Sequence, residues 1–217
     1  MIKNSFILLS IFLLFNFSVY GQKKKKVKVP KKDFLITMTT SKGNIYLLLY
    51  DETPKHKENF LKLTNEGFYN STAFHRVIKN FMIQGGDPNS KDPNKKNMYG
   101  QGGPGYTVDA EFVDKFKHKK GALAAARQGD RTNPTKASSG SQFYIVHNPS
   151  RCKHLNGSYT VYGEVIKGMD VVDKIANVPV SRRGNIPADR ITIEVTAKEM
   201  KRKKITKLYG YKYPKVK

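Results

Sequence analysis

The stretch FHRVIKNFMIQGGD, residues 74–87, is strongly apolar, alternates in the manner of β-strands and ends in two glycines before an aspartate. Its hydrophobic side chains nevertheless surround His75, Arg76 and Gln84. An arginine in a strand usually covers apolar surface with its stem and keeps its charged head in water. Arg76 is therefore either such a surface residue or a side chain held in a cleft for a purpose, and the rest of the chain has to distinguish the two.

The segments around this stretch predict short strands and two widely separated helices. Apolar or alternating runs predict strands at 34–50 (two strands joined by a turn at 41–44), 73–78, 81–84, 121–126, 142–147, 159–166 and 191–200. Helices are predicted from Thr53-Pro54 to about Glu66, and at 169–178. Eight or so short strands without strand–helix–strand alternation favour a mainly β fold, an antiparallel barrel.

The charge of the chain is concentrated at its ends. A formal net charge of +23 over 217 residues would by itself favour nucleic acid or an anionic surface as a partner. Residues 22–32 hold seven lysines and no acid, and residues 198–217 hold nine basic residues against one glutamate. Residues 33–197 carry 23 Lys and Arg against 16 Asp and Glu, so the part predicted to fold is only mildly basic.

This pattern divides the chain into a flexible linker at 22–32, a domain at 33–200 and a basic tail at 201–217. We expect linker and tail to be mobile, dispensable for catalysis on short peptides, and weakly attracted to anionic surfaces. An alternative stays open for the tail, in which Tyr209, Tyr211 and Tyr213 dock on the barrel.

The first 21 residues are typical of an export signal. Lys3 is followed by the ten-residue apolar run FILLSIFLLF and then by small or polar residues, so cleavage after Gly21 is expected. The alternative is a retained membrane anchor, but the run is shorter than the roughly 18–20 residues of a spanning helix. The predicted location is therefore the periplasm or cell envelope.

Several motifs that suggest other chemistry lack the sequence context which that chemistry requires. GQGGPG, residues 100–105, fits the dinucleotide-binding pattern, but no predicted strand enters it and no helix follows. The five histidines never fall at metal-ligand spacing. Cys152 is the only cysteine, which excludes an internal disulfide, and its surroundings lack a nucleophile signature. No metal and no cofactor are expected.

Four motifs in order resemble the cyclophilin-type peptidyl-prolyl cis-trans isomerases. They are FHRVIKNFMIQGGD, GALAAAR (121–127), GSQFYIVH (140–147) and LNGSYTVYGEVIKGMDVVDKI (155–175). The resemblance covers about residues 34–197, and GGPGYTVDAEF (102–112) is similar to the bacterial branch. It implies a closed eight-stranded antiparallel β-barrel capped by two α-helices, and an enzyme that accelerates rotation about X-Pro bonds and so assists protein folding.

The resemblance also gives Arg76 a task. Rotation about an X-Pro bond breaks amide resonance, with a barrier near 18–20 kcal/mol. The proline nitrogen gains a lone pair at the twisted transition state. A fixed guanidinium donor therefore stabilises the transition state more than it stabilises either ground state. Arg76 is the implied catalytic residue. The implied substrate-binding residues are His75, Phe81, Met82, Gln84, Ala126, Arg127, Gln142, Tyr144, His154, Leu155 and Tyr159.

Within this set, Phe81, Met82, Tyr144 and Leu155 are expected to line a pocket for the proline ring. Gln84 and Gln142 are expected to supply polar contacts, the backbone of Ala126 and Arg127 to hydrogen-bond the peptide, and His75 to support Arg76. Three positions depart from common members of the family: Tyr144 replaces Phe, Tyr159 replaces His, and His154 replaces Trp. The loop before Gly140 is also longer than in the compact family pattern.

Three functions compete on this reading. The leading one is an exported, bacterial-like isomerase, expected to be a monomer, whose substrates are unfolded or flexible proline-containing polypeptides. The second is a peptide-binding chaperone module of the same fold without relevant turnover, for which an intact Arg76 is unnecessary. The third, nucleic-acid binding, rests on net charge alone and lacks aromatic residues interleaved with the basic ones.

Overall fold

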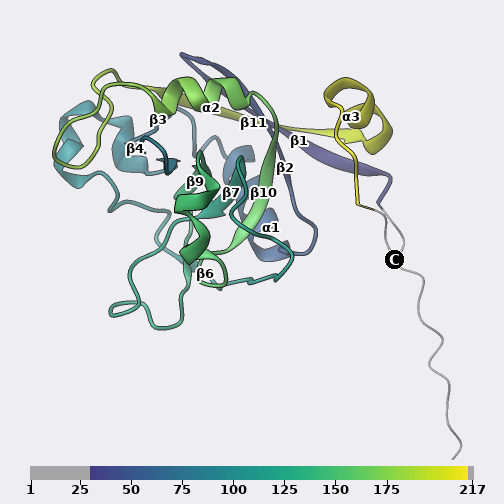
Figure 1. Ribbon diagram of the computed structural model, residues 1–217, viewed down its shortest axis with the longest axis horizontal. Helices are drawn as coiled ribbons and strands as arrows, with labels where there is room; N and C mark the ends of the chain where they lie inside the picture. The colour runs from purple at the N-terminus through teal and green to yellow at the C-terminus, as the bar shows by residue number, and fades with distance from the viewer. Residues whose placement is uncertain (1–29, 215–217) are drawn as a thin grey trace, which may run out of the picture. The chain divides into compact units, whose positions relative to one another are not determined.

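Antiparallel pairing joins most of the chain into one sheet. In the computed structural model, which describes residues 30–214, nine strands form a sheet in the order β3-β11-β1-β2-β10-β7-β9-β5-β4 (Figure 1). The strands are β1 (Lys32–Thr40), β2 (Gly43–Leu49), β3 (Thr72–Ala73), β4 (Arg76–Ile78), β5 (Met82–Gly85), β7 (Ala122–Ala125), β9 (Phe143–Val146), β10 (Val161–Lys167) and β11 (Thr192–Lys201). Two short strands, β6 (Thr107–Val108) and β8 (Ser138–Ser139), form a separate pair.

The predicted closed eight-stranded barrel is not confirmed, because the curled sheet has nine strands and two unjoined edges. The edge strands β3 and β4 have only two and three residues and do not pair with each other. Part of the β4 edge is covered by a loop instead of a strand, since the Val77 amide donates to the carbonyl oxygen of Asn185 at 2.9 Å.

The two predicted helices are present and pack on the main core. Helix α1 (Pro54–Asn65) begins at a proline and buries Phe60 and Leu63, while α2 (Met169–Ala176) buries Val172 and Ile175. They lie apart in Figure 1, with α2 at the top and α1 lower, and α1 contacts β11 while α2 contacts β2, β4 and β5. Together with the inward side chains of the sheet they enclose one large hydrophobic core.

Strand alternation produces a second, smaller hydrophobic cluster on the other face of the sheet. Ile83 of β5 and Ile145 of β9 point into the main core, while their neighbours Met82 and Tyr144 belong to the second cluster. Four strands share this pattern, which places a patch of apolar side chains outside the main core. The members of the second cluster are Met82, Ala122, Ala124, Tyr144, Val146, Cys152, Leu155 and Val161.

The basic C-terminal segment is structured, so the expectation of a mobile tail is wrong for residues 201–214. Strand β11 runs to Lys201, and helix α3 (Arg202–Tyr209) follows directly, beside the ends of β1 and β11 (Figure 1). Its one buried side chain is Ile205, which is fully inaccessible to solvent. The alternative of docking tyrosines describes this segment better: the Tyr209 ring lies 5.0 Å from that of Tyr46.

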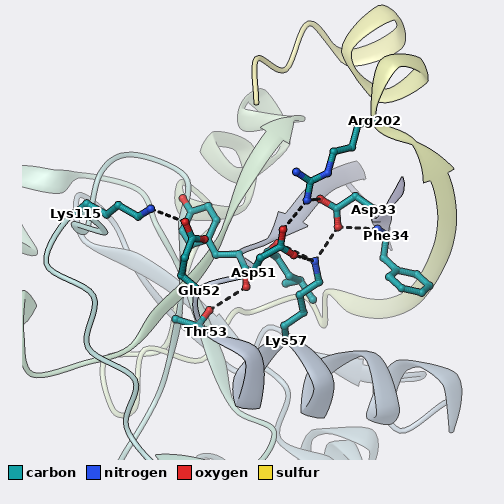
Figure 2. A network of polar contacts seen from close by, with 10 residues as sticks. Asp33, Phe34, Asp51, Glu52, Thr53, Lys57, Lys115 and Arg202 are labelled. Carbon is teal, nitrogen blue, oxygen red and sulfur yellow. Dashed lines mark hydrogen bonds and ion pairs between the residues drawn. The ribbon is translucent and has the colours of Figure 1, made fainter. Parts of the chain in front are cut away.

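An ionic network fastens α3 to the domain (Figure 2). Arg202 Nη2 lies 2.5 Å from Asp51 Oδ2 and 3.6 Å from Asp33 Oδ2. Lys57 of α1 bridges the same two carboxylates at 2.7 and 2.8 Å. Since Asp33 is buried, these two cations neutralise a charge that would otherwise be costly inside the fold.

The predicted export signal and most of the predicted linker lie outside the described residues. Within residues 30–214, no helix has the length and apolar character needed to cross a membrane.

Candidate active site

The register of four neighbouring strands brings the key residues into one row. Arg76 of β4 is directly opposite Gln84 of β5, Gln84 is opposite Tyr144 of β9, and Tyr144 is opposite Ala124 of β7. Residues directly opposite each other in a ladder present their side chains on the same face. The row therefore extends from the guanidinium at the sheet edge to the second hydrophobic cluster.

Side-chain amides hold the arginine in place. Arg76 Nη1 donates to Gln84 Oε1 at 3.1 Å, Gln84 Nε2 donates to Gln142 Oε1 at 3.1 Å, and Gln142 Nε2 donates to the carbonyl oxygen of Gly102 at 2.7 Å. Each amide uses one oxygen and one nitrogen, so the orientation of the whole relay is fixed. Of the predicted polar residues, Gln84 therefore positions Arg76 directly, and Gln142 positions Gln84.

Arg76 keeps an uncompensated charge. Its side chain is half-buried, and no carboxylate within residues 30–214 forms an ion pair with it. Burial lowers the pKa of its guanidinium from the ordinary value, with a smaller opposing effect of Tyr159. Arginine nevertheless stays protonated at neutral pH. A positive donor that is positioned by neutral groups is free to interact with a developing lone pair.

The residues predicted to form the proline pocket come together in the second cluster. Met82, Tyr144 and Leu155 are buried members, and Phe81 packs on them while remaining partly exposed. Ala126 and Tyr159 pack against the same cluster. Residues distant in sequence thus form one apolar surface beside the row that carries Arg76.

Arg127 contributes through its side chain, which was not expected. The guanidinium lies 4.4 Å from the centroid of the Tyr159 ring, and that ring meets Tyr144 edge-on at 6.1 Å. Arg127 also donates to the carbonyl oxygen of Ser158 at 2.7 Å and pairs with Asp130 at 2.6 Å. It therefore holds Tyr159 against the pocket.

The backbone of Ala126 is already engaged within the protein. Its amide donates to the Gln142 carbonyl oxygen at 2.9 Å, and its carbonyl oxygen accepts from the Ser139 amide at 2.8 Å. Only the second lone pair of that carbonyl remains for a peptide. At Ala126, the carbonyl oxygen is therefore the only backbone group that can still hydrogen-bond a peptide substrate.

His75 does not join the pocket cluster. Its ring is 2 % exposed and lies edge-on to Tyr99 at 6.2 Å, with neither ring nitrogen hydrogen-bonded among the described residues. Burial lowers the pKa of His75 to about 4, against the opposing charge of Asp87. A neutral, enclosed imidazole suits the expected supporting role and leaves no surface for direct substrate contact.

The glycines that end the opening stretch allow β5 to lie close to its neighbours. Gly86 adopts a φ of +84°, and a Cβ there would overlap the carbonyl oxygen of Ser141. The buried carboxylate of Asp87 then accepts the amides of Asn89 and Gly100. These bonds fold the glycine-rich loop 100–105 back toward the sheet. The Gly102 carbonyl oxygen in this loop thereby comes within hydrogen-bond distance of Gln142.

His154 lies at the exposed margin of the pocket. Its ring is nearly parallel to that of Phe81, with centroids 6.3 Å apart. Both rings also line a cavity of about 940 Å³. The remaining residues that line it are Ile78, Lys79, Asn80, Asn148, Ser150 and Arg151.

Two residues of this region were missed from the sequence. His118 Nε2 lies 2.7 Å from the Tyr144 hydroxyl, and Asn156 Oδ1 lies 2.8 Å from the other ring nitrogen of His118. The sequence feature that could have indicated them is Tyr144, which replaces the Phe of common family members. A buried tyrosine hydroxyl requires a hydrogen-bond partner. No group of three or more potential metal ligands occurs in the part of the chain that the structure covers.

Comparisons with known proteins agree with this geometry. The family model described as "Cyclophilin type peptidyl-prolyl cis-trans isomerase/CLD" matches residues 35–198. The chain belongs to this family of prolyl isomerases. Its function is that of a peptidyl-prolyl cis-trans isomerase, which confirms the predicted activity.

The relatives compared are eukaryotic. The chain is 38% identical over 162 residues to the peptidyl-prolyl cis-trans isomerase CYP18-1 of Arabidopsis thaliana, covering 74% of this chain and 90% of that protein. It is 38% identical over 161 residues to a peptidyl-prolyl cis-trans isomerase-like 3 of Dictyostelium discoideum, covering 73% and 91%. It spans only 29% of a peptidyl-prolyl cis-trans isomerase-like 2 of Rhizopus delemar, to which it is 36% identical. These relatives do not support the bacterial-like assignment.

Solved structures show the same fold. A cyclophilin type peptidyl-prolyl cis-trans isomerase of Cryptosporidium parvum superposes with a TM-score of 0.66 at 30% identity, covering 77% of this chain and 98% of that one. A second crystal structure of that protein, in the presence of the dipeptide Ala-Pro, gives a TM-score of 0.64 at 30% identity, covering 75% and 97%.

Proposed function

We propose that Arg76 catalyses the isomerisation of X-Pro bonds by donating a hydrogen bond to the proline nitrogen as that nitrogen becomes pyramidal. The observation that carries this is the position of a half-buried guanidinium, without a carboxylate partner among residues 30–214, beside an apolar cluster. The amide relay fixes the donor before substrate arrives, so little reorganisation is needed at the transition state.

The substrates we propose are proline-containing segments of unfolded or flexible polypeptides. The cluster of Met82, Tyr144 and Leu155, with Phe81 at its edge, is apolar and suits a proline ring. The Cryptosporidium parvum relative was crystallised in the presence of Ala-Pro, which supports a small X-Pro unit as the recognised element. Burial of the ring is favourable by roughly 25 cal/mol per Å² of apolar surface.

Isomerase activity is tested with the full chain in a protease-coupled assay on a short X-Pro peptide. We expect the cis-to-trans rate to rise in proportion to enzyme concentration, with no dependence on added metal or cofactor. An Ala-for-Pro version of the peptide is the matched control and should show no slow phase. A cis-to-trans rate that the protein leaves at its spontaneous value would contradict the proposal.

We also propose that the protein is an exported, bacterial-like and monomeric member of the family. Support comes from the apolar run at 6–15 and from the similarity of residues 102–112 to the bacterial branch. Intact-mass measurement of protein from its native host tests export: a chain that begins near Gln22 is expected. A membrane-bound chain that retains residues 1–21 would show an anchor instead.

A further inference from the structure

The wall of the proposed proline pocket contains a buried hydroxyl. Tyr144 is 4 % exposed, and burial raises the pKa of its phenol well above the ordinary value, so the group keeps its proton. An apolar pocket tolerates such a hydroxyl only where the proton has an acceptor, because an unpaired buried donor is costly. The structure supplies that acceptor from outside the predicted site.

The acceptor is a histidine from the loop before β7. His118 is 3 % exposed, and its Nε2 lies 2.7 Å from the Tyr144 hydroxyl. The two rings are nearly parallel, at 11° with centroids 5.9 Å apart. Burial lowers the pKa of His118, with the nearby His154 contributing in the same direction and the Asn156 hydrogen bond opposing. The neutral imidazole is therefore favoured.

Asn156 determines which ring nitrogen carries the proton. Its Oδ1 lies 2.8 Å from His118 Nδ1 and also accepts the His118 backbone amide at 2.9 Å. A carbonyl oxygen only accepts, so Nδ1 must carry the hydrogen and Nε2 must present its lone pair. The Tyr144 hydroxyl consequently donates its proton to His118.

This chain of contacts also joins two walls of the pocket. Tyr144 belongs to β9, and Asn156 directly follows Leu155, the pocket residue at the end of the 3-10 turn Lys153–Leu155. His118 comes from a third segment and connects the other two. Displacement of one wall relative to the other would break at least one of these hydrogen bonds.

We propose that His118 is a positioning residue of the proline pocket, which keeps the Tyr144 hydroxyl proton directed into the protein and fixes the distance between the Tyr144 and Leu155 walls. This inference rests on the proposed function for the identity of the ligand. Without the histidine acceptor, the hydroxyl would bind water in the pocket, and a proline ring would displace that water without replacing its hydrogen bond.

The test is a double-mutant cycle with His118→Phe and Tyr144→Phe, read by NMR titration of an X-Pro peptide and by turnover. His118→Phe retains a stacking ring but no acceptor, and we expect it to raise the peptide Kd about tenfold. The same change made in the Tyr144→Phe background should raise Kd by less than about threefold, because no hydroxyl is left to satisfy. His118→Gln, which retains both an acceptor and a donor, should recover most of the affinity.

A purely structural role for His118 predicts a different result: an equal loss of affinity in both backgrounds, which would overturn the inference. Imidazole ¹⁵N shifts of the wild-type protein give a second criterion that needs no variant. The inference predicts the Nδ1–H tautomer for His118, and an Nε2–H tautomer or a charged ring at neutral pH would overturn it. Peptide binding without turnover in the wild type would instead contradict the proposed function.

Discussion

Arg76 and Gln84 are directly opposite each other in the β4–β5 ladder, and the guanidinium donates to the Gln84 amide oxygen at 3.1 Å. This pair answers the question that the opening stretch raises. The arginine is not a surface residue that extends into water, because its head is held by a neighbouring strand. The amide that holds it is itself held by Gln142.

We predict that Gln84→Leu lowers kcat/KM for X-Pro peptides by about 10- to 100-fold, the range that misplacement of a catalytic group produces. The guanidinium would lose its only side-chain acceptor among the described residues and would sample other rotamers. Asn65→Leu removes an exposed amide at the end of α1 with no side-chain hydrogen bond among the described residues; it is the control and should behave as wild type. If kcat/KM of Gln84→Leu equals that of wild type, the amide relay does not position Arg76.

The C-terminal helix is predicted to stabilise the domain. Arg202→Ala should lower the free energy of unfolding by about 1–3 kcal/mol, because it removes hydrogen-bonded charge from the carboxylates of Asp33 and Asp51. Urea denaturation followed by circular dichroism measures this. Lys203→Ala, exposed on the same helix, is the control and should change stability little. Equal stability of the two variants would mean that α3 adds nothing through this network.

We predict that the protein loses stability as pH falls from about 6.5 to 4, because a buried histidine, His75, resists protonation in the folded state. The pKa of His75 is lowered to about 4 by burial, against about 6.5 in an unfolded chain. Between those values the unfolded state binds a proton that the folded state does not, so stability falls as pH decreases from about 6.5 to 4. For His75 alone the loss is about 3 kcal/mol.

Urea unfolding at a series of pH values measures this loss, and His75→Phe is the informative variant. The slope of unfolding free energy against pH should be shallower in the variant, although not flat, since burial also lowers the pKa of His56 and of His118. An unchanged slope between pH 6.5 and 4 would show that His75 is not the buried neutral group described above.

Much of the fold and site could be predicted because local patterns encode them. Proline at the start of α1, the alternation of β11 and the apolar spacing of α2 are all readable within one segment. The assembly of Arg76, Gln84 and Tyr144 followed from a family resemblance, and the strand register explains it physically.

The parts that could not be predicted depend on partners distant in sequence. The segment after residue 200 is rich in lysine and resembles a solvated tail, yet Arg202 meets Asp33 and Asp51 across more than 150 positions. The sequence around His118 gives no sign of its role, which depends on the hydrogen bond to Tyr144, a residue 26 positions away. The number of strands and the open edges likewise depend on pairings that involve only two or three residues, which carry no periodic signal.

The most direct test of the central claim is the isomerisation rate of an Arg76→Ala variant. NMR exchange spectroscopy on an X-Pro peptide gives kcat and the peptide Kd from the same samples, and Arg76→Lys tests whether charge without the fixed fork suffices. We predict that Arg76→Ala lowers kcat by about 10²–10³-fold, the cost of losing one preorganised donor, while peptide Kd and the melting temperature change little. Undiminished kcat in a folded Arg76→Ala protein would contradict the assignment of Arg76 as the catalytic residue.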